Sequence, residues 1–151
     1  MRLPAWSRSA VGVLVVAASV WYVSAPPRSA ASYRERAAMT AEILRSNVQS
    51  TRIWARTLTR DDTLTTAAAV AFQEAEEDAA KAAASFSAYD PPPGTDGLRS
   101  DLSALSNDVD EALGSVRIAS QRSQWSRVPA TAAALPRLAA RLERFVHRAR
   151  G

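Results

Sequence analysis

The chain has 151 residues, with 19 basic and 15 acidic side chains and a formal net charge of +4. It has no cysteine, which excludes disulfides, thiolate metal ligands, a cysteine nucleophile and a lipidated N-terminal cysteine. Alanine is abundant and only five glycines are present, so the composition favours helix.

An apolar segment opens the chain after a short cytoplasmic leader, residues 1–8. Residues 9–27 contain no charged side chain and lie between Arg8 and Arg28. Their length just meets the roughly 20 residues that a helix needs to cross a bilayer core about 30 Å thick. We therefore predict a single transmembrane helix, retained as a signal anchor and in contact with membrane lipid.

Two alternatives remain open for this segment. Its strongest apolar run, residues 11–23, also has the length of the hydrophobic part of a cleaved signal peptide. Cleavage needs small residues three and one positions before the cut, and Val23-Ser24-Ala25 fits this pattern, although Pro26 would follow the cut. Cleavage would produce a secreted soluble protein. A buried core helix is the third interpretation.

The orientation of the domain rests on two opposing signals. The leader holds two arginines and the twenty residues after the segment hold four, which under the positive-inside rule favours a cytoplasmic domain. The leader nevertheless has the form of a signal sequence, and long domains translocate largely regardless of charge. We expect the C-terminal domain on the extracytoplasmic face of the cell membrane.

A linker, residues 28–33, and two helices, at about 34–59 and 63–89, follow. Spacings of three and four place one apolar face on the first helix, which Ile43, Ile53 and Trp54 are expected to widen. Helix-breaking residues at 59–63 predict a turn, and one continuous rod over 33–89 is the alternative. The apolar face of the first helix contains Ala37, Ala41, Leu44, Val48, Thr51, Ala55 and Leu58; that of the second contains Leu64, Ala68, Ala71, Ala75, Ala79, Ala82, Phe86 and Tyr89.

The segment Asp90-Pro91-Pro92-Pro93-Gly94 ends the second helix, because proline cannot continue helical hydrogen bonding. Two further helices are expected at about 96–120 and 129–149, with Pro136 starting or kinking the last one. Four amphipathic helices predict an all-α protein: an antiparallel four-helix bundle with coiled-coil-like packing after the transmembrane helix. The third face contains Leu98, Leu102, Leu105, Val109, Ala112, Val116 and Ala119; the fourth contains Leu135, Leu138, Leu142, Phe145 and Ala149.

Charge divides the domain into three blocks. Residues 34–60 carry a net charge of +4, residues 61–111 carry −10 and residues 112–151 carry +7. The first and last helices are thus basic and the middle two acidic. We expect each basic helix to lie beside an acidic one, an arrangement that selects partners and register more than it adds stability.

Four arginines of the last helix, Arg137, Arg141, Arg144 and Arg148, share one helical face. They could attract anionic lipid or an anionic wall polymer, or they could pair with the acidic helices. No aromatic platform accompanies them, so we expect no nucleic-acid binding. Trp125, in the third connection, is a candidate contact for a protein partner, although packing against the core is the simpler interpretation.

No catalytic or cofactor motif occurs in the chain. His147 is the only histidine and is read as a surface residue. Two acidic groups, residues 74–78 and 108–111, are read as solvated faces that pair with basic helices, since they do not form a calcium loop. We therefore expect that the protein is not an enzyme and that it holds no metal and no cofactor.

Three stretches carry a resemblance: AYDPPPGTDGLRSDL at 88–102, DEALGSVRIA at 110–119 and LPRLAARLERF at 135–145. With them the chain resembles a loose group of small, uncharacterised actinobacterial proteins that have one N-terminal apolar segment and an alanine-rich helical domain. The resemblance implies a membrane-anchored or secreted helical protein and carries over no functional residue.

These observations lead to one expected function and two alternatives. We expect a single-pass, membrane-anchored extracytoplasmic bundle with a binding or scaffolding role at the cell surface. The alternatives are a secreted bundle and a sensor-like bundle that works with a partner protein. The alanine-rich faces would also suit a homo-oligomer.

Overall fold

The computed structural model describes residues 29–58 and 64–151. The apolar segment 9–27 and the turn expected at 59–63 lie outside these residues. The regular structure of the described part is entirely helical, which confirms the predicted all-α class. None of its helices combines the length and the apolar character that crossing a bilayer requires.

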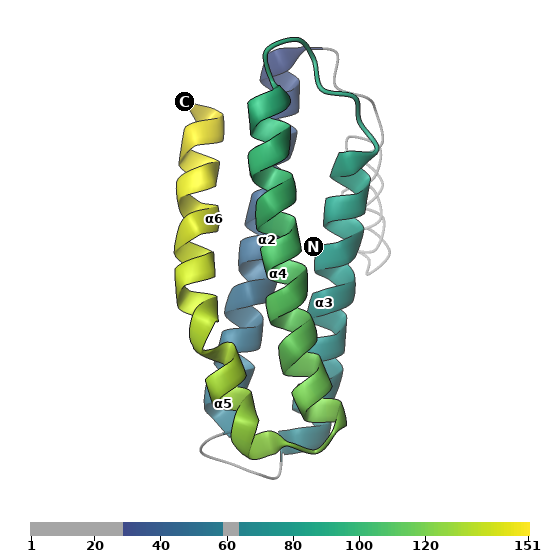
Figure 1. Ribbon diagram of the computed structural model, residues 1–151, viewed down its shortest axis with the longest axis vertical. Coiled ribbons are helices and arrows are strands. Elements are labelled where there is room, and N and C mark those ends of the chain that lie inside the picture. Colours follow the sequence, from purple (N-terminus) through teal and green to yellow (C-terminus); the bar gives the residue numbers. More distant parts are fainter. Residues whose placement is uncertain (1–28, 59–63) are drawn as a thin grey trace, which may run out of the picture.

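Four long helices pack side by side: α2 (Ala30–Leu58), α3 (Thr65–Ser87), α4 (Asp96–Gln121) and α6 (Leu135–Arg150). They run alternately up and down, so that α2 and α4 start, and α3 and α6 end, at the same end of the bundle (Figure 1). The rings of Tyr33 and Phe86 lie 5.0 Å apart between α2 and α3. This contact excludes one continuous rod over residues 33–89.

The first helix starts earlier than the predicted linker 28–33 allows. The hydroxyl of Ser29 accepts a hydrogen bond from the Ser32 amide at 3.2 Å, and the hydroxyl of Ser32 accepts one from the Ser29 amide at 3.2 Å. This reciprocal arrangement is a capping box, which satisfies two amides at a helix start. Helix α2 therefore begins at Ala30, and the linker prediction was wrong by four residues.

The predicted fourth helix, 129–149, is interrupted. Three short elements, η2 (Trp125–Arg127), α5 (Val128–Thr131) and η3 (Ala132–Ala134), precede α6. Pro136 lies in the first turn of α6, where its missing amide costs nothing, whereas its ring would clash with a continuous α-helix upstream. The expectation that Pro136 starts the main part of this helix is confirmed.

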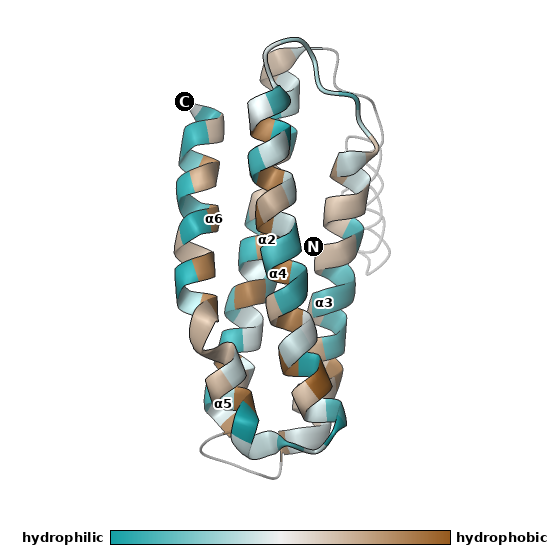
Figure 2. Cartoon of the chain, in the orientation of Figure 1, coloured by the Kyte–Doolittle hydropathy of each residue, from teal (hydrophilic) through white to brown (hydrophobic). Residues whose placement is uncertain are grey.

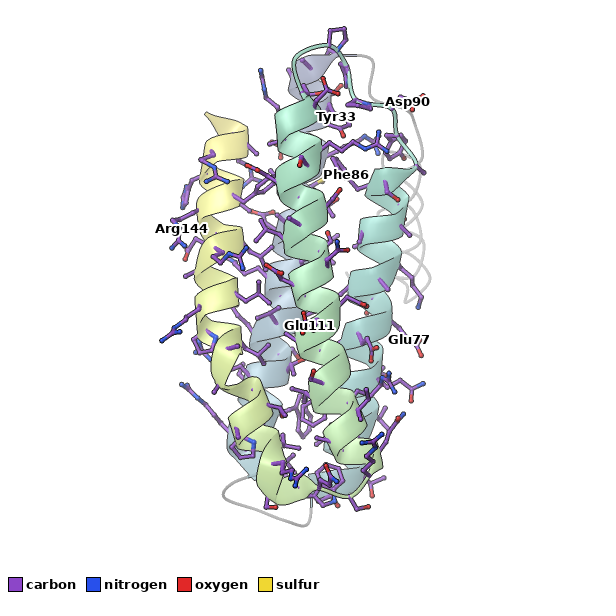
Figure 3. All side chains as sticks on the ribbon, in the orientation of Figure 1. Tyr33, Glu77, Phe86, Asp90, Glu111 and Arg144 are labelled. Atoms are coloured by element: carbon purple, nitrogen blue, oxygen red, sulfur yellow. The ribbon has the colours of Figure 1, made fainter. Side chains whose placement is uncertain are left out.

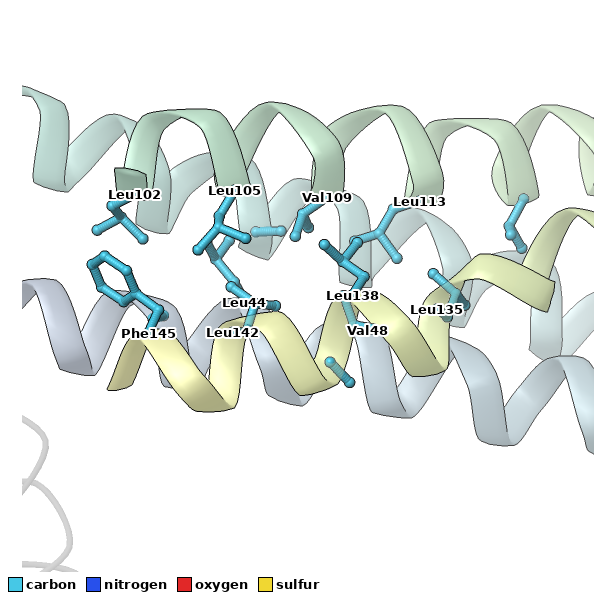
Figure 4. Close-up of a cluster of buried hydrophobic side chains, with 14 of the residues drawn as sticks. Leu44, Val48, Leu102, Leu105, Val109, Leu113, Leu135, Leu138, Leu142 and Phe145 are labelled. Atoms are coloured by element: carbon cyan, nitrogen blue, oxygen red, sulfur yellow. The ribbon is translucent and has the colours of Figure 1, made fainter. Parts of the chain in front are cut away.

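The core runs along the bundle axis as a row of leucines and valines from α2, α4 and α6, with Phe145 beside Leu102 at one end of the row (Figure 4). The faces predicted for α2 and α6 are fully buried. Coloured by hydropathy, the helices show brown faces turned inward among teal ones (Figure 2). Phe72 of α3 and Leu113 of α4 are buried core residues that the predicted faces omitted. Ile43 and Ile53 were predicted to widen the buried face of α2, but they are exposed.

Ion pairs connect the helices in an unexpected pattern. The two basic helices, α2 and α6, lie beside each other and are joined through their few glutamates. The pairs between them are Arg45 with Glu143 at 3.1 Å, and Arg150 with Glu35 at 3.2 Å and Glu42 at 2.8 Å. The expected pairing of a basic helix with an acidic one occurs between α6 and α4.

Candidate functional site: a groove between α2 and α3

A groove of about 670 Å³ lies between α2 and α3, in the half of the bundle where α2 begins. Its floor is largely apolar, with Met39 and Ile43 from α2 and Ala82 and Phe86 from α3. Polar and charged side chains surround this floor. The complete lining is Arg36, Met39, Thr40, Glu42, Ile43, Ser46, Asn47, Asp78, Lys81, Ala82, Ser85, Phe86 and Tyr89.

The local sequence explains why the two helices leave this space. On α3 the flank that faces α2 carries alanine, serine and a charged residue, none of which covers much apolar surface. Phe86, the large residue of this region, is buried and stacks its tilted ring against Tyr33. Ile43 is therefore left 46 % exposed, although it lies beside a neighbouring helix. The groove is a consequence of small side chains on one helix flank.

The rim of the groove is polar and ordered by local contacts. At the end near the start of α2, Arg36 donates a hydrogen bond to the Tyr89 hydroxyl at 3.2 Å, and its guanidinium carbon lies 4.8 Å from the centre of that ring. On α3, Lys81 lies 3.6 Å from Asp78 and 3.9 Å from Glu77. Glu77 projects outward from α3 (Figure 3). An apolar floor with a charged rim is the form of a site that binds an amphipathic ligand.

The groove does not extend along the whole length of α2. Trp54 follows Ile43 by eleven residues, about three helical turns, and so lies on the same flank of α2. Its ring is partly buried and packs against the core. On α2 the groove lining ends at Asn47, so the groove is confined to the part of the helix that precedes Trp54.

The predicted arginine face is only partly available for an anionic ligand. Arg141 lies 2.5 Å from Asp108, and Arg148 lies 3.3 Å from Asp101, both on α4. Within the described residues, Arg137 and Arg144 form no ion pair, and Arg144 projects outward from α6 (Figure 3). Two clefts of about 500 and 300 Å³ adjoin these arginines and are lined by both arginine and acidic residues. The contact with an anionic surface stays a prediction.

The remaining candidates have simpler places in the fold. Trp125 is partly buried and packs against the core beneath the end of α4, as the simpler interpretation expected. His147 is exposed on α6. Glu76 turns inward and pairs with Arg117 of α4, whereas the other acids of its cluster are exposed. In residues 29–58 and 64–151, no three potential metal ligands come together.

Tyr33 is the most unusual polar residue near the groove. Its side chain is 0 % exposed, and its hydroxyl has no hydrogen-bond partner among the described residues. Burial raises the pKa of Tyr33, the positive charge of Arg99 lowers it and the negative charge of Asp96 raises it. The tyrosine thus carries a buried donor that a phenylalanine would not.

Sequence reasoning missed the groove. The available signal was the polar pair Ser46 and Asn47 close to Ile43 on α2, opposite a flank of α3 made of alanine and serine. Comparison with protein-family models, with curated proteins and with solved structures found no match to this chain. The site is therefore argued from its own geometry.

Proposed function

We propose that the protein is a membrane-anchored binding protein without enzymatic activity. In this proposal residues 9–27 hold it in the cell membrane by a single span, and the bundle lies on the extracytoplasmic side. The groove between α2 and α3 receives the apolar face of a helix from a partner protein. No cofactor takes part.

The groove is the observation that carries the binding role. Its apolar floor runs along two helices, and its rim offers charges of both signs. Amphipathic helices dock into such grooves by placing residues spaced three and four apart on the floor and polar residues at the rim.

The spacing between the apolar segment and α2 supports a site close to the bilayer. Only Arg28 and Ser29 separate Pro27 from the first residue of α2. At roughly 3.3–3.6 Å a residue, the start of α2 lies within about 10 Å of the end of the segment. The groove occupies the half of the bundle next to that start, so a partner helix at or just above the membrane surface could reach it.

Protease accessibility tests the anchoring and the orientation. Intact and broken cells would be treated with protease, and the intact mass of each protected or released species would be measured. The proposal predicts digestion of the bundle in intact cells, with full-length protein in untreated membranes. Protection until lysis would place the bundle in the cytoplasm, and a shortened species in the medium would show secretion; either result would contradict the proposal.

Photo-crosslinking tests the groove. A photoreactive phenylalanine derivative would replace Ile43 in the groove or, as the matched control, Val70, which is similarly exposed on α3 but does not line the groove. Illumination of intact cells is expected to give discrete higher-mass adducts from position 43 and none from position 70. Equal yields at the two positions, or none at either, would remove the groove as the binding site.

A further inference from the structure

We propose that the bundle has a second binding surface of a different kind: the exposed face of α6 in one copy of the chain binds the exposed face of α3 in the next copy. Each molecule then has a neighbour on either side, so that copies assemble into an open row. The inference goes beyond the proposed function and does not depend on it. It follows from the position, the charge and the height of the two faces.

The two helices form opposite edges of the bundle. Helix α6 lies at one side and α3 at the other, with α2 and α4 between them (Figure 1). Helix α2 packs against each of them. A side chain that projects outward from α6 therefore points away from α3. The charges of the two edges do not neutralise each other within one molecule, but they are free to do so between two molecules.

The two edges carry opposite charge. Helix α6 contains five arginines and one glutamate, a net charge of +4 with His147 neutral, whereas α3 contains four acids and one lysine, a net charge of −3. Arg144 projects outward from α6, and Glu77 projects outward from α3 on the other side (Figure 3). Arg137 is exposed on the same face as Arg144, because seven residues make two helical turns. Complementary charge of this kind steers two surfaces together and fixes their register.

These charges are available to a second molecule. The two outward arginines of α6 and Glu74 of α3 form no ion pair within the part of the chain that the structure describes. Glu77 and Asp78 lie 3.9 Å and 3.6 Å from Lys81 of their own helix, and the Lys81 side chain is 72 % exposed. Exposed pairs of this kind contribute little to stability. The acids of α3 can therefore exchange this lysine for an arginine of another copy.

The opposite charges also lie at the same height along the bundle. The ion pair at Arg45 of α2 holds α6 so that the four arginines of its exposed face lie beside about residues 40–51 of α2. The contacts at Tyr33 and Arg36 hold α3 so that its acids lie beside about the same part of α2. A second copy that is displaced sideways, without a shift along the bundle axis, brings arginine opposite acid.

A second copy satisfies both edges at once. An anionic polymer would meet Asp101 and Asp108, which line the clefts beside the arginines of α6, and it would leave the acids of α3 without a partner. The two edges are different surfaces, so the contact between copies is heterologous. A sideways displacement includes no rotation that would close a ring, and the copies therefore form a row in which every α2 begins at the same end.

Sedimentation velocity of the full-length protein tests this inference. An uncharged detergent, dodecyl maltoside, would cover the apolar residues 9–27 without binding charged side chains. The natural chain should form species of increasing mass as its concentration rises in about 50 mM salt, and these species should dissociate in about 500 mM salt, because salt screens exposed charges.

Neutral substitutions separate the two edges. Arg137→Gln with Arg144→Gln removes the basic edge, and Glu74→Gln with Glu77→Gln removes the acidic edge. Each double variant should associate with itself at least about tenfold more weakly than the natural chain. A mixture of the two double variants should give dimers and no larger species, because one intact edge of each kind remains in the mixture.

Matched control variants change the same number of charges elsewhere. Arg34→Gln with Arg122→Gln removes two exposed arginines outside α6, and Asp90→Asn with Asp96→Asn removes two exposed acids outside α3. Both controls should associate like the natural chain. Circular dichroism would verify that every variant retains the helical fold.

Four results would overturn the inference: a natural chain that stays a single species at every concentration, a natural chain that stops at a dimer, controls that weaken association as much as the edge variants, or a mixture without dimers. If the natural chain stays a single species but binds inorganic polyphosphate, and Arg137→Gln with Arg144→Gln abolishes this binding, the α6 face binds a polyanion and not a second copy. Photo-crosslinking from position 43 reports on the groove alone, so a failure of self-association is distinguishable from a failure of the proposed binding site.

Discussion

The two flanks of α2 present a contrast within one helix. Ala38 and Ile43 lie on opposite flanks, each about 100–120° around the helix from Leu44, which faces the core. Ala38, on the flank towards α6, is 0 % exposed, whereas Ile43, on the flank towards α3, is 46 % exposed. Equivalent positions on the same helix are thus buried by one neighbour and left open by the other.

The difference lies in the neighbouring helices. Towards α2, helix α6 presents buried Val146 and Ala149 and closes the seam at its edges with Glu143 and Arg150. Helix α3 presents Ala82 and Ser85. Apolar volume decides which flank is closed, because exposed ion pairs contribute little to stability.

The largest expected effect comes from removing volume on the closed side. Leu142 is completely buried between the helices, so Leu142→Ala should lower the free energy of unfolding by about 2–5 kcal/mol. Ile43→Ala on the open side should change it by less than about 1 kcal/mol. Urea unfolding followed by circular dichroism would measure both, and similar losses would show that both flanks are closed.

Adding volume, by replacing an alanine with leucine, should give the next largest difference in the free energy of unfolding between the two sides. Ala41 is fully buried, and Ala41→Leu should cost about 1–3 kcal/mol, because the extra atoms have no space. Ala82 lines the groove, so Ala82→Leu should be nearly neutral in the free energy of unfolding while reducing photo-crosslinking from position 43. A strong destabilisation by Ala82→Leu would mean that the groove is narrower than the structure shows.

The buried hydroxyl of Tyr33 should make the stability of the fold depend on pH. The hydroxyl without a partner predicts that Tyr33→Phe is neutral or stabilising, by up to about 1–3 kcal/mol. Since folding raises the pKa of Tyr33 above its ordinary value of 10.0, the folded state retains a proton that the unfolded state loses. The contribution of this hydroxyl to the free energy of unfolding is therefore fully present below pH 10 and is lost as the pH rises above that value.

Urea midpoints between pH 8 and pH 11 would test this sign. The natural chain should lose stability relative to Tyr33→Phe on going above pH 10. If the difference between the two proteins were independent of pH, the buried hydroxyl would not titrate as the structure implies.

The smallest effect concerns the edge of the closed side. Arg45 and Glu143 are both partly exposed, and a double-mutant cycle with alanine should give an interaction energy of about 0.2–1 kcal/mol. The value should fall in high salt. An interaction well above this range would mean that ion pairs, and not apolar volume, hold α6 against α2.

The sequence predicted what depends on periodicity. The buried faces of α2 and α6, and the start of α4 at Asp96, follow from residues spaced three and four apart and from proline chemistry. The start of α2 was missed because the capping box of Ser29 and Ser32 is formed by side-chain hydrogen bonds that periodicity does not register. The spacing of apolar residues therefore predicted the helices and their buried faces better than it predicted where the helices begin.

The groove could not be predicted in the same way. Whether Ile43 is covered depends on the side chains that α3 places opposite it, and pairing across two helices is a tertiary property. Each basic helix does lie beside an acidic one, α2 beside α3 and α6 beside α4, but the contact between the two basic helices α2 and α6 was not predicted. The net charge of a whole helix does not show that the few glutamates of α2 and α6 lie where these two helices meet.

Thiol labelling of two single-cysteine variants, bound to lipid vesicles, tests the central claim most directly. Ala38→Cys and Ile43→Cys place a thiol on each flank of α2 in a chain with no other cysteine. The account predicts that position 43 reacts at least about tenfold faster, because reaction at position 38 requires local opening. Equal rates at the two positions would contradict an open groove between α2 and α3, and with it the proposed binding site.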